Sequence, residues 1–467
     1  MHTTTLETPT PHTFWLHLGA GAFHRAHQSW YLDQLHKLGD TRWSLALGNI
    51  RNSASQTTLD QLASQQGVYT LEVISPEGDI DYQTLRAIKK VIPWDPELAQ
   101  LIAVGASPDT KLISFTVTEG GYFLKDDGHL DLAHPAIVEE IASTGKISTL
   151  YGILVAILRQ RMATQAGPIT LLNCDNLRHN GDSLRRGLME YLTALNDKAL
   201  AAWCETAIST PNSMVDRITP KTDAALLERV QAQGIDDDLV PVACEAFSQW
   251  VIEDDFIAGR PELERVGVEF VDDVIPFEEA KIRVLNASHS GIAWAGALLG
   301  AQSIDESLTP LVKQWIRDYV EQDVSAVLPS GPIDVNQYCS TTLHRFGNAK
   351  VPDTTQRVSS DSIAKLQQFI LPTLKTRYQQ GEVPRATLVL VALYYLFMQR
   401  RAAGALPFDY QDRAIESVPF DAIFAEQDSL QAFAQSSALF GALVEQPTFT
   451  DDLRGAVTQV TQLLTGP

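Results

Sequence analysis

The stretch FWLHLGAGAFHRAH, residues 14–27, decides the fold of the first half of the chain. It is a short apolar run that ends in glycine, and a helical pattern over 23–38 follows it. Gly19 and Gly21 stand where the predicted strand turns into the predicted helix. Glycine there lets the backbone approach a pyrophosphate, which then lies at the helix N-terminus. The full G-x-G-x-x-G fingerprint is absent because His24 occupies its last position, so a purely steric strand-to-helix turn remains the alternative.

Strands and helices alternate along the rest of this half. Further strands are predicted at 43–50, 111–119 and 168–176, with helices at 53–66 and 147–165. This alternation is typical of βαβ units and predicts a parallel, doubly wound sheet. We expect three later β-rich runs to extend the same sheet with mixed strand directions: 239–247, 250–256 and 266–273.

The pattern changes after about residue 276, where β-rich runs become few. Helical periodicity marks four later segments: 281–300, 308–325, 360–378 and 386–403. We therefore expect an α/β, doubly wound domain over residues 1–275 and a mainly α-helical domain over 276–467. No extended linker separates the two predicted domains, so close packing between them is expected.

Composition narrows the classes of function and partner. The chain has a net charge of −21, which argues against nucleic acid or an anionic membrane as a partner. No apolar run is long enough to span a bilayer, and the first residues lack the features of a signal peptide, so a cytoplasmic protein is expected. The four scattered cysteines show no metal-ligand spacing, and no metal is predicted. A monomer or a small homo-oligomer fits this composition.

The segment KIRVLNASHS, residues 281–290, carries the strongest chemical signal. Read as an α-helix, it places Lys281, Asn286 and His289 within an arc of about 140°. A lysine, a carboxamide and an imidazole on one side of a helix can transfer a proton and bind an oxyanion. The alternative is an amphipathic helix whose lysine reaches solvent while the other two side chains cap neighbouring elements.

The end of the second predicted strand bears on the cofactor. An acidic residue usually follows this strand and binds the adenosine ribose, but here no acid occurs before Asp60. Asn49 can still bond to ribose hydroxyls, and Arg51 can meet a 2′-phosphate. Local chemistry therefore leaves the choice between NAD and NADP open.

Polar residues also follow two later strands, where ligands of such folds bind. In TVTEGGY (116–122), Glu119 is a candidate for the nicotinamide side, although the glycines also fit a simple tight turn. In NCDNLRHNG (173–181), Asn176 is a candidate amide donor. Its alternative is a helix N-cap, for which Asp175 and Asn176 are both suited.

Two further segments are predicted as polar loops. PNSMVDRITP (211–220) carries Asp216 and Arg217, which could simply pair with each other on the surface. RFGNAKVPDTTQRVSSDSIAK (345–365) carries a basic cluster in an acidic chain, and a solvated loop and helix face is its alternative. The cluster consists of Asn348, Arg357 and Lys365.

Taken in order, these motifs resemble the polyol-specific long-chain dehydrogenases, the mannitol 2-dehydrogenase family. The similarity runs from about residue 14 to the 440s, and P-N-S-M-V-D-R-I-T-P and K-I-R-x-L-N-x-x-H-S are its most specific parts. GNIRN, SPEGDIDY and LLNCDNLRHNG look most similar to the bacterial branch that acts on D-arabinitol.

The resemblance implies a Rossmann-like first domain, a helical second domain and an active site between them. It implies that Lys281 is the general base, that Asn176 and Asn286 hold the reacting oxygen, and that His289 orients the substrate carbinol. It also implies that Glu278 gates proton exchange with solvent. Polyol binding falls on three residues by the same argument: Asp216, Arg357 and Lys365.

The implied cofactor is NAD, with NADP use possible because the family's acid after the second strand is missing here. The candidate cofactor-binding residues are Gly19, Gly21, Phe23, Asn49, Arg51, Thr118 and Glu119. The expected reaction is oxidation of a secondary alcohol of a linear polyol, from D-arabinitol to D-xylulose. To accept the proton, Lys281 must be neutral, which requires a pKa lowered by burial to roughly 7–8.

Two alternatives remain. Mannitol or another hexitol is the alternative substrate, since D-arabinitol and D-mannitol share stereochemistry around the oxidised carbon. A nucleotide-binding regulator on the same fold is the alternative from another class, but such a sensor has no use for a base such as Lys281.

Overall fold

The computed structural model describes residues 13–51, 54–125, 127–143, 146–328, 331–351 and 353–465. The chain forms two compact units. The first consists of Met1–Ser75 and Asp79–Val274, and the second of Pro76–Gly78 and Ile275–Pro467. Among the described residues, no helix combines the length and apolar character that crossing a membrane requires.

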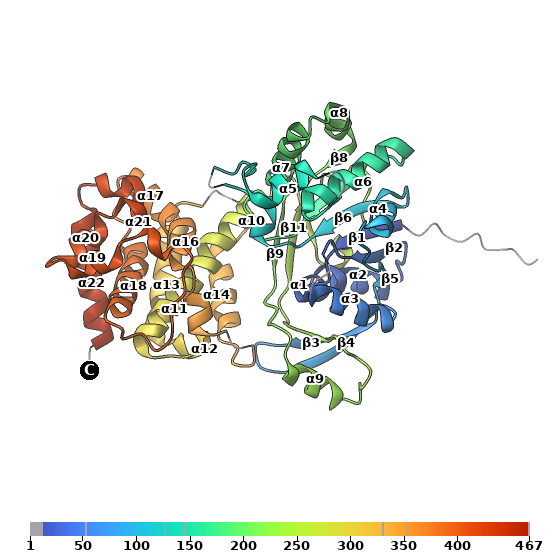
Figure 1. Ribbon diagram of the computed structural model, residues 1–467. Helices are drawn as coiled ribbons and strands as arrows, with labels where there is room; N and C mark the ends of the chain where they lie inside the picture. Colours follow the sequence, from blue (N-terminus) through green and yellow to red (C-terminus); the bar gives the residue numbers. More distant parts are fainter. Residues whose placement is uncertain are drawn as a thin grey trace, which may run out of the picture. The chain divides into compact units, whose positions relative to one another are not determined.

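A six-stranded sheet organises the first unit (Figure 1). Every neighbouring pair of its strands is parallel, which confirms the doubly wound α/β prediction. The strand order reverses between β1 and β6, and ligands of such sheets bind at the carboxyl ends beside that point. In spatial order the strands are β5 (Ile88–Val91), β2 (Trp43–Gly48), β1 (Thr13–Leu18), β6 (Thr110–Phe115), β7 (Ile169–Asn173) and β8 (Ile208–Ser209).

Both faces of this sheet are buried. Successive strand residues point to opposite faces, so Trp15 joins one core and Leu16 the other. Tyr31 of α2 and Leu59 of α3 pack on the first core, and Leu154 of α6 packs on the second. The helices of this unit are α1 (Ala22–Ala26), α2 (Gln28–Lys37), α3 (Ala54–Ser64), α4 (Ala99–Ala106), η1 (Glu119–Tyr122), α5 (Pro135–Ala142), α6 (Leu150–Thr164), α7 (Asn180–Ala194), α8 (Lys198–Ala207), α9 (Ala224–Gln231) and η2 (Leu263–Val266).

The later β-rich runs do not extend the main sheet, and that prediction was wrong. β10 (Val242–Glu245) instead pairs with β3 (Tyr69–Ile74), which forms an antiparallel hairpin with β4 (Ile80–Leu85). β11 (Gln249–Glu253) lies between β12 (Glu269–Val271) and β9 (Ser213–Asp216) in a third sheet. The hairpin supplies a free edge for β10 that alternation along the sequence does not reveal.

The segment 211–220 is not a loop, because β9 runs through its centre. All four residues of β9 are buried, and the strand pairs antiparallel with β11. Pro211 and Pro220 lie outside the strand, so neither removes an amide that its ladder needs. The prolines therefore bound this strand instead of preventing it.

The second unit is helical, as predicted, and α11 and α18 are buried along most of their length. A Cβ on Gly291 of α11 would lie 2.7 Å from the Leu390 side chain of α18, so glycine permits this close helix contact. The elements are α10 (Ile275–Ala280), η3 (Lys281–Asn286), α11 (Ala287–Leu299), α12 (Ile304–Ser307), α13 (Pro310–Asp318), η4 (Tyr319–Val324), α14 (Val335–Phe346), α15 (Thr355–Ser359), α16 (Ser362–Lys365), η5 (Leu366–Ile370), α17 (Leu371–Gln379), α18 (Arg385–Ala402), η6 (Ile415–Ser417), α19 (Phe420–Ala425), α20 (Ser429–Ala434), α21 (Ser437–Phe440), η7 (Gly441–Glu445) and α22 (Phe449–Thr465).

Three of these elements are turns of π-helix: η3, η4 and η5. Each lies inside a segment that the sequence predicts as continuous α-helix. In a π-helix the hydrogen bonds join residues five apart, so side-chain directions differ from those of an α-helix. This change affects the candidate catalytic segment directly.

Candidate active site

The turn after β1 has the backbone that a phosphate-binding turn requires. Gly19 has φ 113°, a conformation that favours glycine, and its N–H donates to the Gly48 carbonyl at 2.8 Å. Gly21 is the N-cap of α1. A Cβ added to either glycine would meet no atom within 4 Å among the described residues. The space beside the turn is therefore open, and the residues present fit a dinucleotide at this position.

Hydrogen bonds of the buried Arg25 side chain stabilise this turn. The Arg25 side chain donates from Nε to the Ala20 carbonyl at 3.1 Å and from Nη1 to the Val240 carbonyl. Tyr69 donates its hydroxyl to the Arg25 carbonyl at 2.6 Å. The motif contains Arg25, but the sequence does not reveal this role, since Tyr69 and Val240 lie far from Arg25 along the chain.

Two histidines on either side of the same turn in the sequence, His17 of β1 and His24 of α1, stack on each other. The His17 and His24 ring centroids are 3.4 Å apart, and both side chains are fully buried. Burial lowers the pKa of His17 to about 3, and it also lowers the pKa of His24. Both imidazoles are therefore neutral at physiological pH.

The residues after β2 are held by nearby carbonyl groups. Asn49 donates from Nδ2 to the Arg51 carbonyl at 2.8 Å, and Arg51 donates from Nε to the Ser148 carbonyl at 3.0 Å. The guanidinium of Arg51 is thus directed towards the segment before α6. Asn52 and Ser53, where an acid would be expected to sharpen a preference for NAD, lie outside the described residues.

The turn after β6 is strained and is held by Asp175. Thr118 has φ 64°, an unusual backbone for a β-branched residue. The amides of Val117 and Thr118 each donate to the Asp175 carboxylate at 2.9 Å, and Tyr122 donates its hydroxyl to the same group at 2.5 Å. Burial raises the pKa of Asp175. Strain that surrounding contacts enforce is typical of ligand-binding turns, and Glu119 follows directly.

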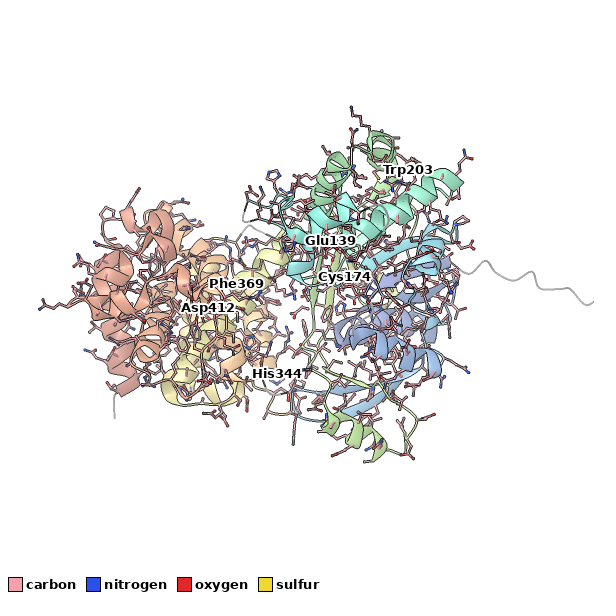
Figure 2. The ribbon with its side chains drawn as sticks, viewed as in Figure 1. Glu139, Cys174, Trp203, His344, Phe369 and Asp412 are labelled. Atoms are coloured by element: carbon pink, nitrogen blue, oxygen red, sulfur yellow. The ribbon has the colours of Figure 1, made fainter. Side chains whose placement is uncertain are left out.

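Asn176 follows Asp175 beyond the end of β7, where Cys174 is labelled in Figure 2. The alternative of an N-cap is wrong, because α7 begins after His179 and has no side-chain cap bond. The Asn180 side chain links this segment to β9 by donating to the Ser213 carbonyl at 2.8 Å. Asp216 is the last residue of β9 and is buried.

Candidate residues thus follow the carboxyl ends of four adjacent strands of the main sheet. β2, β1, β6 and β7 are neighbours in parallel, so their carboxyl ends lie together. The residues that follow these strands are Asn49 and Arg51, Gly19, Gly21 and Phe23, Thr118 and Glu119, and Asn176.

In the second unit, Lys281 and Asn286 are the first and last residues of η3. The Ala287 amide donates to the Ile282 carbonyl, five residues back, which is the π-helical pattern. The arc derived from an α-helix therefore does not apply, and a separation of five residues closes about one turn. Lys281 is buried, as is Glu278 three residues before it. Residues three apart lie on the same side of a helix.

His289 lies one turn further, against an aromatic ring and a carboxylate. Its ring stacks on Phe346 of α14, with centroids 4.2 Å apart, and its Nε2 lies 3.6 Å from Asp353 Oδ2. Burial lowers the pKa of His289 to about 4, so the ring is neutral. Sequence reasoning missed Asp353, although it stands inside the polar segment that was singled out.

Asp353 also engages Arg357. The guanidinium of Arg357 binds both oxygens of this carboxylate, which lies four residues earlier. Lys365 donates from Nζ to the Val358 carbonyl at 2.7 Å, and burial lowers its pKa. Arg357 and Lys365 are therefore held by local contacts, although the Arg357 side chain is 70% exposed, as the alternative of a solvated face predicts.

The cysteines and acidic residues form no metal site in the part of the chain that the structure describes. No group of three or more His, Cys, Asp or Glu side chains there is arranged to hold an ion. All four cysteines are buried thiols.

Family models and known relatives match nearly the whole chain. The Mannitol dehydrogenase Rossmann domain matches residues 14–265, and the Mannitol dehydrogenase C-terminal domain matches residues 273–461. The D-arabinitol 4-dehydrogenase of Klebsiella pneumoniae is 46% identical over 451 residues, covering 96% of this chain and 98% of that protein. The D-arabinitol 4-dehydrogenase of Ralstonia nicotianae is 45% identical over 448 residues, covering 95% and 96%.

A solved structure shares the whole architecture. The mannitol 2-dehydrogenase of Pseudomonas fluorescens, in a ternary complex with NAD and D-mannitol, superposes with a TM-score of 0.82 at 32% identity. The match covers 98% of this chain and 95% of that one. Together with the two matched domains, these similarities confirm the resemblance drawn from the motifs, and the chain belongs to the mannitol dehydrogenase family of polyol oxidoreductases.

Proposed function

We propose that this protein catalyses the reversible, NAD-dependent oxidation of D-arabinitol to D-xylulose. The observation that carries this proposal is the 46% identity to a D-arabinitol 4-dehydrogenase over 96% of the chain. The more distant relation to a mannitol 2-dehydrogenase, at 32% identity, supports the same reaction type on a linear polyol.

Lys281 is the proposed general base. Its position in the buried π turn suits a lysine that must be neutral before it takes a proton from the substrate hydroxyl. Asn286 and Asn176 donate to the oxygen as negative charge develops on it, each worth on the order of 3 kcal/mol if typical of such donors. Bound NAD supplies the acceptor for the hydride.

His289 orients the carbinol as a neutral imidazole, and Glu278 gates the exchange of the Lys281 proton with solvent. Stacking on Phe346 fixes the plane of the His289 ring. The remaining hydroxyls of the polyol are bound by Asp216, Arg357 and Lys365. The Lys365 side chain is half-buried, and its bond to the Val358 carbonyl fixes the ammonium for such a contact.

The proposed cofactor site lies at the carboxyl ends of the strands of the main sheet. Gly19 and Gly21 approach the pyrophosphate, and Phe23 lies on the helix that follows. Asn49 and Arg51 face the adenosine ribose. Thr118 and Glu119 lie on the nicotinamide side.

D-Mannitol is the second candidate substrate, since a related structure holds it together with NAD. Initial rates at 340 nm with D-arabinitol, D-mannitol, D-sorbitol and xylitol, each with NAD and NADP, separate the candidates. We expect the highest kcat/KM for D-arabinitol with NAD, and a measurable rate with NADP. A D-mannitol kcat/KM above that for D-arabinitol would replace the proposed substrate, and no turnover of any polyol would favour a regulator.

The same assay tests metal dependence. Rates after prolonged dialysis against a strong chelator are expected to equal those before it. Stoichiometric zinc whose removal abolishes activity would contradict a lysine-based mechanism.

We also propose that the protein acts in the cytoplasm as a monomer or small homo-oligomer. Light scattering coupled to size exclusion tests the assembly, and cell fractionation tests the location.

A further inference from the structure

The π turn that carries Lys281 and Asn286 alters the hydrogen bonding of the helix. In an α-helix the Ala287 amide would donate to the Arg283 carbonyl, four residues back. Here that amide donates to the carbonyls of Ile282 and Val284 instead. The Arg283 carbonyl thus loses the donor that a regular helix would give it. A buried carbonyl left without a donor costs about 1–3 kcal/mol.

A tyrosine from another element supplies a donor to this carbonyl. The Tyr319 hydroxyl donates to the Arg283 carbonyl at 2.9 Å. Tyr319 is fully buried at the start of η4, and burial raises its pKa, so the hydroxyl keeps its proton. The contact joins two π turns that are 36 residues apart in the sequence.

The Arg283 side chain fixes the same turn from two further directions. Its Nε donates to Glu279 Oε2 at 2.7 Å, and its Nη1 donates to Thr373 Oγ1 at 3.3 Å. Thr373 is fully buried in α17, just after the third π turn, η5, in which Phe369 is labelled in Figure 2. The backbone and side chain of Arg283 are therefore both held.

We propose that Tyr319 is a positioning residue for the catalytic turn. By donating to the Arg283 carbonyl, it keeps residues 281–286 π-helical, and this shape sets the relative directions of Lys281 and Asn286. Without the hydroxyl, the Ala287 amide can return to Arg283 and the turn can relax towards an α-helix. The angle between Asn286 and Lys281 about the helix axis would then widen to about 140°, the separation of residues five apart in an α-helix. The inference rests on the proposed roles of Lys281 and Asn286.

Tyr319→Phe tests this role because it removes only the hydroxyl. We expect kcat with D-arabinitol to fall about 10-fold or more, since small misplacements of reacting groups are costly. The dissociation constant of NADH should stay within about twofold, because the proposed cofactor residues lie in the first unit. The pH profile of kcat should also shift, which a purely structural role would not cause.

Tyr395→Phe is the matched control. Tyr395 lies in α18 of the same unit and its hydroxyl is 2.8 Å from Ser429 Oγ. Both variants lose one hydroxyl bond, so similar losses of thermal stability are expected, but Tyr395→Phe should keep wild-type kcat. Thr373→Val should lower kcat in the same direction as Tyr319→Phe, and Thr373→Ser should restore it.

A kcat for Tyr319→Phe within about twofold of wild type would overturn the positioning role. Equal losses of kcat in Tyr319→Phe and Tyr395→Phe would also overturn it, since a general loss of stability would then explain both. Lys281→Ala, together with the wild-type rate, separates this inference from the proposed function. An inactive Lys281→Ala with a fully active Tyr319→Phe defeats only the positioning role. An active Lys281→Ala defeats the general-base role on which this inference rests, whereas the proposed function fails only if the wild-type protein does not oxidise D-arabinitol.

Discussion

At the scale of single residues, Asp175 shows how a buried carboxylate shapes a binding turn. Its two oxygens accept the amides of Val117 and Thr118 and the hydroxyl of Tyr122. These bonds help to hold Thr118 at φ 64°, a conformation that costs on the order of 1–3 kcal/mol. Asp175 therefore fixes the position of Glu119, a candidate for the nicotinamide side.

Asp175→Asn is expected to weaken cofactor binding. The amide group cannot accept from all three donors, so the turn after β6 should relax. We expect KM for NAD to rise about 10-fold and the free energy of unfolding to fall by about 1–3 kcal/mol. Steady-state kinetics and urea unfolding measure the two effects. Tyr122→Phe keeps both amide bonds and should change KM for NAD much less; an unchanged KM in Asp175→Asn would show that the turn does not contact the cofactor.

The motifs point to candidate residues but not to the residues that hold them in place. Lys281, Asn286 and His289 were singled out because they stand within ten residues of one another. Asp353 and Tyr319 were missed because each acts through a contact that links distant parts of the chain. Asp175 was noticed only as a possible cap, since nothing in the sequence shows that residues 117 and 118 donate to it.

At the scale of elements, the sequence predicts the glycine turn after β1 but not the π turns. The G-x-G spacing after an apolar run predicts the first, and Gly19 indeed has φ 113°. The π turns have no such signal, because a shift from four-residue to five-residue hydrogen bonds depends on packing. The sequence does not predict the strand β9 either, since flanking prolines are typical of a loop.

Gly19→Ala should reduce dinucleotide binding through backbone strain. An alanine at φ 113° is disfavoured by about 1–2 kcal/mol, and relief of that strain would move the turn. Gly234, in the segment after α9, has φ 78° and equally open surroundings, so Gly234→Ala is a control for strain alone. Both variants should lose stability, but only Gly19→Ala should raise the dissociation constant of NADH, measured by fluorescence. Equal NADH binding in the two variants would remove Gly19 from the cofactor site.

At the scale of the whole molecule, alternation of strands and helices predicts the parallel sheet, and the change of pattern near residue 276 predicts the helical half. The division of the later strands into separate sheets could not be predicted, since a hairpin and a parallel strand compete for the same edges. Each unit carries part of the candidate set, so experiments that test the roles use the whole chain.

Buried histidines in both units make stability depend on pH. The pKa of His17 is lowered to about 3 and that of His289 to about 4, and the pKa of His24 is also lowered. In the unfolded chain these groups take up protons near pH 6.5, so the unfolded state binds more protons below that pH. The raised pKa of Asp175 acts in the opposite sense, but it is one carboxyl against three imidazoles.

The free energy of unfolding should therefore fall as the pH drops from 7 to 5, by on the order of 2 kcal/mol for each of the three imidazoles at pH 5. Urea unfolding at pH 7, 6 and 5 measures the change. An equal or higher midpoint at pH 5 would contradict the assignment of neutral, buried rings to these histidines.

We propose that a lysine in a π turn, Lys281, performs the proton transfer of this polyol dehydrogenase. The most direct test is the kcat of Lys281→Ala for D-arabinitol and NAD at 340 nm, with NADH binding measured on the same protein. We predict a loss of about 1,000-fold or more in kcat with the NADH dissociation constant little changed, since general-base catalysis is typically worth 100- to 10,000-fold. Retention of more than about a tenth of wild-type kcat would show that Lys281 is not the base.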